Sequence, residues 1–217
     1  MVDMLLCDVI VTYVVEDGYF IQQSAEGAAI YIYIGKSWPY SAPEAGQVID
    51  LQVTKYGEYK GLQEIVAADQ PVVNSTTALD DFYLDITAGT FPSEALESRL
   101  IKGIGLGVTS SMGSEVSVDY GLAENIQMFV GAGEELCPGA TFDIVQGVIT
   151  EYEGVHQLKV WNRDTDLANI KNDSCPVYDD TNCAEVPNLH EGGVGHEVAD
   201  QHLLVRSNPV LDDLGVL

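Results

Sequence analysis

The chain has 217 residues, of which 46% are hydrophobic, and its 34 acidic residues against 9 basic ones give a formal charge of −25. Because affinity for nucleic acid comes mainly from Lys and Arg that neutralise phosphates, this charge argues against a nucleic-acid partner. The same charge can attract divalent cations, although adaptation to a salty habitat produces a similar acidic excess. No apolar run approaches the roughly 20 residues of a membrane-spanning helix.

Strands are predicted from the N-terminus onward, because apolar residues recur with a period of two and no long helical period occurs. The stretch DGYFIQQSAEGAAIYIYIG, residues 17–35, predicts two strands joined by a small polar turn. In the second strand, isoleucines at 30, 32 and 34 share one face, and Tyr31 and Tyr33 share the other. The isoleucine face is predicted to be the core.

A tyrosine-rich outer surface is the corresponding prediction for the opposite face. Its predicted members are Tyr19, Tyr31, Tyr33, Tyr56 and Tyr59. Aromatic faces of this kind stack bases or sugars in many OB-folds. Tyrosine also suits packing against another domain or subunit, with the hydroxyl reaching water. Only three lysines lie nearby in the sequence, so a packing or protein interface is the favoured interpretation.

The second half of the chain repeats the first. IYIYIG corresponds to IQMFVG, and AGQVIDLQVTKYGEYKGLQ corresponds to PGATFDIVQGVITEYEGVHQ. Gly46 and Gly61 correspond to Gly139 and Gly154 with the same separation. Each copy offers about five short strands, a number that suits a small closed barrel with no exposed edges.

The predicted fold class is therefore all-β, with two tandem OB-like five-stranded barrels and a C-terminal extension. The predicted parts are barrel 1 (1–70), a linker (71–98), barrel 2 (99–171), and a disulfide loop with a C-terminal strand (172–217). Residues predicted to point into the two barrels include Phe20, Ile30, Ile32, Ile104 and Met128.

The segments VIVTYVVEDGYFIQQ, AAIYIYIG and AGQVIDLQVTKYGEYKGLQEI together resemble the tandem OB-fold modules near the N-termini of bacterial secreted endonucleases and in acidic secreted proteins or lipoproteins. SEALESRLIKGIGLGVTSS is similar to the bridge between such modules, and the resemblance covers about residues 2–170. It implies an OB fold. It implies no nuclease activity, because the metal-binding and histidine residues of the endonuclease are missing; a second departure from the family pattern is Gln22–Gln23 in place of the usual Gln-Asp.

The four cysteines bear on the compartment in which the protein works. Cys175 and Cys183 flank the turn-rich loop CPVYDDTNC, which predicts a local disulfide and an oxidising location, extracellular, periplasmic or at the cell surface. A signal for export would then already have been removed, because the N-terminal stretch lacks the basic region of a signal peptide. Cys7 and Cys137 are predicted to be buried thiols, with a long-range bridge as the alternative.

Two sets of residues are candidate metal ligands. Asp164 and Asp166 alternate so that both carboxylates could bind one Ca²⁺, although the later Gly and Glu of an EF-hand loop are missing. His190 and His196, with nearby carboxylates, could bind zinc or copper, although their spacing matches no known ligand signature. For both sets a solvated loop is the simpler interpretation, so no cofactor is predicted beyond this possible calcium.

In the family that the chain resembles, a stretch similar to LHEGGV leads into the first strand of a module; here HLLVRS follows it and is similar to DVIVTY of residues 8–13, so the resemblance implies the opening of a third unit. A strand centred on Leu203 and Val205 needs a partner edge, either in its own barrels or in another copy. We therefore expect a non-enzymatic, exported structural or interaction protein that self-assembles by strand addition and whose partner is itself or another protein. No catalytic motif is present. The alternative is an OB-type binding module for single-stranded nucleic acid or glycan.

Overall fold

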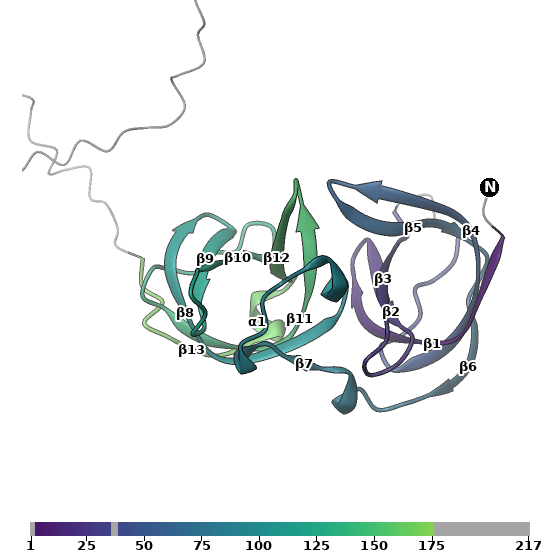
Figure 1. Cartoon of the computed structure of the whole chain (residues 1–217), viewed down its shortest axis with the longest axis horizontal. Helices are drawn as coiled ribbons and strands as arrows, with labels where there is room; N and C mark the ends of the chain where they lie inside the picture. Colours follow the sequence, from purple (N-terminus) through teal and green to yellow (C-terminus); the bar gives the residue numbers. More distant parts are fainter. Residues whose placement is uncertain (1–2, 36–38, 176–217) are drawn as a thin grey trace, which may run out of the picture. The chain divides into compact units, whose positions relative to one another are not determined.

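The computed structural model of the chain describes residues 3–35 and 39–175, and these residues form two closed five-stranded β-barrels (Figure 1). The strands of the first sheet are β1 (Met4–Val15), β2 (Gly18–Gln22), β3 (Ala29–Tyr33), β4 (Gln47–Tyr59), β5 (Leu62–Ala68) and β6 (Val72–Thr76). They are ordered β1-β2-β3-β5-β4, the pairing of β1 with β4 closes the barrel, and β6 adds to β4 outside the ring. Successive side chains of a strand point to opposite faces, so the alternation of apolar and polar residues in the sequence places the apolar ones on the buried inner face.

The second sheet has the same order of strands. Its members are β7 (Leu84–Asp85), β8 (Leu100–Met112), β9 (Glu115–Asp119), β10 (Ile126–Val130), β11 (Thr141–Tyr152), β12 (Val155–Val160) and β13 (Leu167–Lys171). The ring runs β8-β9-β10-β12-β11 and is closed by β11 pairing with β8. In both barrels the third and fifth strands in chain order are neighbours and pair in parallel, as β3 with β5 and as β10 with β12. The prediction of two tandem OB-like barrels is confirmed.

The internal repeat extends to single hydrogen bonds. The N–H of Gly46 donates to the carbonyl of Val11, and the N–H of Gly139 donates to the carbonyl of Val108; each N–O distance is 2.8 Å. Likewise, the Thr12 hydroxyl donates to the carbonyl of Phe20, and the Thr109 hydroxyl to that of Ser117. The two halves of the chain are thus copies of one structural unit, closed by the same contacts.

A bulge in the first strand of each barrel is also repeated. Asp8 in β1 has a φ of 52° and Gly105 in β8 a φ of 70°, and pairing with the neighbouring strand shifts register at both points. A carboxylate holds each bulge: Asp50 accepts from the Asp8 N–H at 2.9 Å, and Asp143 from the Gly105 N–H at 2.7 Å. Bulges of this kind give the long first strand the bend that a small barrel needs.

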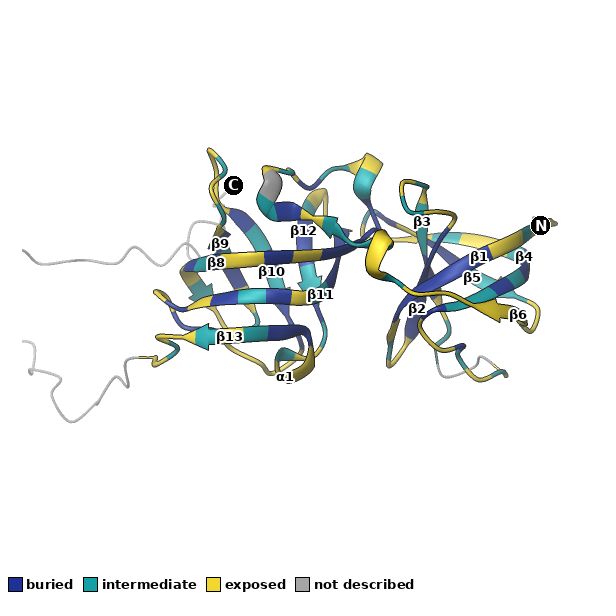
Figure 2. Cartoon of the chain, turned by 90° about the horizontal axis from the view of Figure 1, so that it is seen from below, coloured by how far each residue is buried: buried dark blue, intermediate teal, exposed yellow. Residues whose placement is uncertain are grey.

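Each barrel has its own hydrophobic core, visible as the dark blue strand segments of Figure 2. The first core consists of Val9, Val11, Tyr19, Ile21, Ile32, Ile49, Leu51, Val53 and Ile65. The second is larger and includes Met128, Phe142, Ile144, Leu158 and Leu167. Two predicted core residues lie elsewhere: Phe20 is buried on the opposite face of β2 from Ile21, and Ile104 is 70% exposed beside the β8 bulge.

Residues 71–98, predicted to be a linker, contain strands of both sheets. β6 pairs with β4 of the first barrel, although all five of its residues are exposed (Figure 2), and β7 pairs in parallel with β8 of the second. Between and after these strands lie the short 3-10 helices η1 (Asp80–Phe82), η2 (Ile86–Ala88) and η3 (Glu94–Leu96). The remaining helix, α1 (Arg163–Asp166), leads from β12 into β13. The segment is therefore anchored to the barrels by backbone hydrogen bonds.

A third cluster of buried side chains joins the two barrels. Its buried members are Tyr13, Phe20, Tyr31, Leu62, Leu100 and Val148, with Trp161 and Tyr83 among the half-buried residues around them. The rings of Phe20 and Tyr13 each lie within 6 Å of the Trp161 ring, in edge-to-face geometry that suits the charge distribution of aromatic rings. Part of the predicted tyrosine surface is therefore packed against the second barrel.

Candidate functional site

An aromatic cleft of about 400 Å³ opens beside this cluster. Strands of both barrels contribute to it, and its lining residues are Asp17, Phe20, Tyr31, Tyr33, Tyr59, Leu62, Glu64, Lys159 and Trp161. Concave sites lined by aromatic rings with a few polar groups are the usual form of ligand pockets. We call these nine residues the aromatic cleft.

The floor of the aromatic cleft is formed by two buried rings that contact each other. Phe20 and Tyr31 are cross-strand partners on β2 and β3, and their ring centroids are 4.7 Å apart. Phe20 is fully buried and Tyr31 is 5% exposed, so neither presents a full ring face to a ligand. Their role is to position the exposed rings around them.

Gly18 and Asp17 hold Tyr31 in place. A Cβ at Gly18 would lie 2.4 Å from the Tyr31 ring and 2.4 Å from the Ile32 carbonyl, so only glycine leaves room for this ring. The Tyr31 hydroxyl donates to Asp17 Oδ1 at 2.9 Å. Burial, followed by the Asp17 charge, raises the pKa of the Tyr31 phenol well above its usual value. The phenol therefore stays a neutral donor at all physiological pH values.

The rim supplies the accessible ring faces. Tyr33 is 42% exposed and Tyr59 is 59% exposed, and the half-buried Trp161 also lines the cleft. Exposed tyrosine and tryptophan faces bind flat rings by stacking, whether these are bases or the apolar faces of sugars.

The charged groups of the aromatic cleft are two carboxylates, Asp17 and Glu64, and one ammonium, Lys159. Lys159 lies over the rings of Trp161 and Phe129, with its Nζ 4.2 Å and 5.2 Å from their centroids. Burial lowers the pKa of this ammonium, and the charge of Asp17 partly opposes the shift. Burial, together with repulsion from Asp17, raises the pKa of Glu64. The cleft can therefore accept hydrogen bonds from a ligand through its carboxylates, and Lys159 is the one charged donor among its lining residues.

The predicted tyrosine surface is thus divided among four environments, one of which belongs to Tyr56, which is 38% exposed and lies outside the cleft. Tyr33 and Tyr59 line the cleft rim, and Tyr31 is its buried floor. Tyr19 instead belongs to the core of the first barrel, so its assignment to the outer surface is wrong. The reason is register: Tyr19 pairs across strands with Ile32, and cross-strand partners point to the same face of a sheet.

The predicted calcium ligands are not brought together. Asp166 is 1% exposed, and its two oxygens accept hydrogen bonds from the Tyr13 hydroxyl, the Trp161 and Asn162 N–H groups, and the Gln146 amide. Its carboxylate is therefore occupied by protein donors. Asp164 points to solvent with a side chain 88% exposed. Asp166 thus has a structural role in joining the barrels, and calcium at Asp164 and Asp166 stays a prediction.

The disulfide connectivity also differs from the prediction. Cys175 is bonded to Cys137, with Cα atoms 5.0 Å apart, and not to Cys183. Asp173 supports this pairing by accepting from the Cys137 N–H at 2.7 Å, while an ion pair links it to Arg163. Cys7 is an exposed free thiol, not a buried one. The long-range bridge weighed as an alternative joined Cys7 to Cys137, so the Cys137–Cys175 pairing was not predicted; it forms because β13 returns the chain beside residue 137.

Some predicted residues lie outside the described part of the chain. These are Cys183, the histidines His190 and His196, and the tail residues Leu203 and Val205. Within residues 3–35 and 39–175, no helix is long and apolar enough to cross a membrane.

Lys159, Trp161, Asp17 and Glu64 were missed as cleft residues. The first two could have been placed on one face from sequence, because HQLKVW alternates and Leu158 and Val160 belong to the second core. Their proximity to Tyr33 and Tyr59 depends on how the two barrels pack, which no local pattern encodes.

Comparisons with known proteins find similarity at the level of structure alone. No protein-family model matches the sequence, and no curated protein matches it. A murine DNA-binding protein solved with double-stranded DNA is 10% identical, with a TM-score of 0.32, covering 79% of this chain and 98% of that one. A HINb domain is 14% identical, with a TM-score of 0.33, covering 73% of this chain and 92% of that one. A third structure, described as the molecular basis for abrogation of activation of pro-inflammatory cytokines, is 14% identical at a TM-score of 0.30.

Two predictions are corrected. An exported structural protein that self-assembles was expected, and nucleic acid was argued against as a partner; neither expectation stands, and the argument from charge did not consider the stacking surface that the aromatic cleft offers. The argument against nucleic acid relied on the net charge of the whole chain. Net charge determines how strongly phosphates are attracted at long range, but it does not determine whether bases can stack on aromatic rings at one site. At these identities and TM-scores the likeness itself carries no argument about a ligand, so the ligand has to be inferred from the aromatic cleft.

Proposed function

We propose that the protein is a non-enzymatic OB-type binding module that takes single-stranded nucleic acid in the aromatic cleft. The observation that carries the proposal is the grouping of Tyr33, Tyr59 and Trp161 around one opening, over a floor of buried rings. Base stacking on such rings contributes about 1–3 kcal/mol per base and tolerates any sequence, because every base has a flat face.

The polar groups define which edge of a base would enter. Asp17 and Glu64 are acceptors, and every base presents at least one amino or imino donor to them; guanine, with its adjacent N1–H and N2–H2 donors, presents the most. Lys159 is the single cation lining the described cleft, which leaves little capacity to neutralise phosphates. Binding should therefore depend on stacking and change little with salt, unlike binding to a basic groove.

Glycan binding is the second candidate, and the two carboxylates are what favours it. Sugar hydroxyls donate to carboxylates, and an apolar sugar face stacks on tyrosine or tryptophan as a base does. An uncharged glycan also meets no repulsion from the acidic surface.

Fluorescence anisotropy with labelled 10-mers of single-stranded DNA, competed by neutral oligosaccharides, tests both candidates. Tyr33→Ala and Tyr59→Ala should each weaken oligonucleotide binding by about 1–3 kcal/mol. Tyr56→Ala is the matched control, because Tyr56 is 38% exposed but lies outside the cleft. If an oligosaccharide displaces the labelled oligonucleotide at a lower concentration than unlabelled oligonucleotide does, the cleft is assigned to glycan instead. Absence of binding to both classes would refute the proposal.

An oxidising location is a further part of the proposal. Its support is the Cys137–Cys175 disulfide, because such bonds persist mainly outside reducing compartments. The resemblance to modules of bacterial secreted endonucleases is in keeping with the same location.

A further inference from the structure

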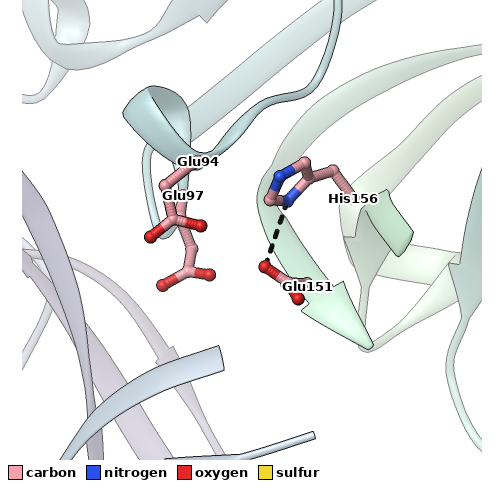
Figure 3. A group of neighbouring side chains, drawn as sticks. All are labelled: Glu94, Glu97, Glu151 and His156. Atoms are coloured by element: carbon pink, nitrogen blue, oxygen red, sulfur yellow. Dashed lines mark ion pairs between the residues drawn. The ribbon is translucent and has the colours of Figure 1, made fainter. Parts of the chain in front are cut away.

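A cluster of three carboxylates and one imidazole lies among residues that are not part of the aromatic cleft. Its members are Glu94, Glu97, Glu151 and His156, and each offers one ligand atom within 4.8 Å of the others. Glu94 and Glu97 come from η3 and the residue after it, while Glu151 and His156 face them from the hairpin of β11 and β12 (Figure 3). Segments distant in sequence thus converge on one point.

The strongest sign of a missing partner is at Glu97. This side chain is 9% exposed, and its Oε1 accepts from the Gln63 N–H at 3.1 Å. Its Oε2 is buried and accepts no hydrogen bond. Burial, with repulsion from Glu94 and Glu151, raises the pKa of this carboxyl to about 7. An unpaired buried oxygen among other carboxylates is costly, and native proteins rarely keep one without a cation or a donor.

His156 shows the same deficit. Its Nδ1 is buried without a hydrogen-bond partner and lies 3.7 Å from Glu151 Oε2, too far for a hydrogen bond. No described ion pair joins Glu94 or Glu97 to a basic side chain. Two buried ligand atoms, Glu97 Oε2 and His156 Nδ1, thus lack a hydrogen-bond partner, and Figure 3 shows that only the ion pair with Glu151 reaches His156 from within the cluster.

Gly61 adds a constraint on Glu151. A Cβ at Gly61 would lie 2.2 Å from Glu151 Oε1, so the Glu151 carboxylate occupies the space that a side chain at position 61, in the turn between β4 and β5, would need. The backbone of Gly61 also bridges to Tyr152. Glu151 is thereby held against the first barrel, and its second oxygen points toward His156.

We propose that Glu94, Glu97, Glu151 and His156 bind one divalent transition-metal ion, of which Zn²⁺ is the best fit. One imidazole nitrogen with carboxylate oxygens suits zinc, whereas Ca²⁺ and Mg²⁺ prefer oxygen ligands alone. Ligand atoms about 2.1 Å from a tetrahedral ion lie roughly 3.4 Å apart, so a modest contraction of the side chains completes the site. The bound ion would tie the segment after β7 to the β11–β12 hairpin, which makes its role structural.

Isothermal titration of the chelator-treated full chain with ZnCl₂ tests the proposal. Glu97→Gln and His156→Gln keep the size of each side chain but remove a ligand, and each should abolish one zinc site or weaken it at least about tenfold. The double variant His190→Gln/His196→Gln is the matched control, because it removes histidines outside the cluster. It should keep the site.

A second readout distinguishes coordination from general stability. With Co²⁺ in place of zinc, the wild-type chain and the control should show the visible absorption of a tetrahedral ion, and His156→Gln should lose it. Zinc should raise the melting temperature of the wild type but not of Glu97→Gln, whose fold is verified by circular dichroism. Zinc binding that persists unchanged in both cluster variants, or that disappears only in the tail variant, would overturn the proposal. So would a wild-type chain that binds no zinc.

Discussion

The Tyr13 hydroxyl donates a hydrogen bond to Asp166 Oδ2, joining residues 153 positions apart, one in each barrel. Both groups are buried, at 4% and 1% exposure. Burial, followed by the hydrogen bond to Asp166, raises the pKa of the Tyr13 phenol far above its usual value. The phenol is therefore a permanent donor, and the contact fixes the packing of the barrels on which the aromatic cleft depends.

Tyr13→Phe should destabilise the protein by about 1.5–3 kcal/mol, because it removes one donor to a buried carboxylate while the ring remains. Urea unfolding measures the change. Tyr56→Phe is the control, since its hydroxyl has only a 3.8 Å contact with the Met4 sulfur, and it should change stability by less than about 0.5 kcal/mol. Equal effects from the two variants would show that the contact between barrels contributes little.

Gly18→Ala should displace the Tyr31 ring and destabilise the first barrel by about 1–3 kcal/mol, because the new methyl group meets ring and backbone atoms at 2.4 Å. It should also weaken ligand binding at the cleft, whose floor is Tyr31. Gly107→Ala is the matched strand glycine, because the nearest atom to its added Cβ lies 3.9 Å away. Thermal unfolding and the anisotropy assay together check this. A Gly18→Ala protein with wild-type stability would contradict the close approach.

Peptide mapping without reductant should find Cys137 joined to Cys175. Because the bond closes a loop with a sequence separation of 38, its loss in Cys137→Ser should cost roughly 4 kcal/mol in the chain-entropy model. Cys7→Ser, which removes the exposed free thiol, is the control and should leave stability unchanged. Recovery of a Cys175–Cys183 peptide in the native protein would reject the observed pairing.

Acid stability should depend on Asp143. The Asn169 amide and the Gly105 N–H both donate to this carboxylate, at 2.6 and 2.7 Å, and lower its pKa. A carboxyl with a lowered pKa in the folded state stabilises above its unfolded pKa, near 4, and this contribution is lost as pH falls through the folded value. Asp143→Asn should therefore flatten the decline of stability below about pH 4.

Urea unfolding at a series of pH values measures that decline. Asp164→Asn, at a side chain 88% exposed to solvent, should leave the shape of the curve unaltered. If Asp143→Asn reproduced the wild-type curve, the carboxylate would not be the group that holds the β8 bulge.

The sequence by itself determined the strands, the repeat and the barrel class. These follow from local alternation: Ile30, Ile32 and Ile34 must share a face, and the same alternation returns at Ile126, Met128 and Val130. The matched glycines Gly46 and Gly139 then form the same hydrogen bond in both barrels. Such features depend on neighbours in the chain, so a pattern of period two carries them.

What only the tertiary structure decided are the contacts made across the chain. Register placed Tyr19 with Ile32 in the core, although it stands two residues from Asp17 of the cleft. Barrel packing brought Lys159 and Trp161 to Tyr33 and Tyr59. Folding of β13 set Cys175 beside Cys137 in preference to a local partner. Each of these pairings brings together segments that are not neighbours in the chain. Which segments meet is decided by strand register and by the packing of the whole fold, and a local sequence pattern does not contain that information.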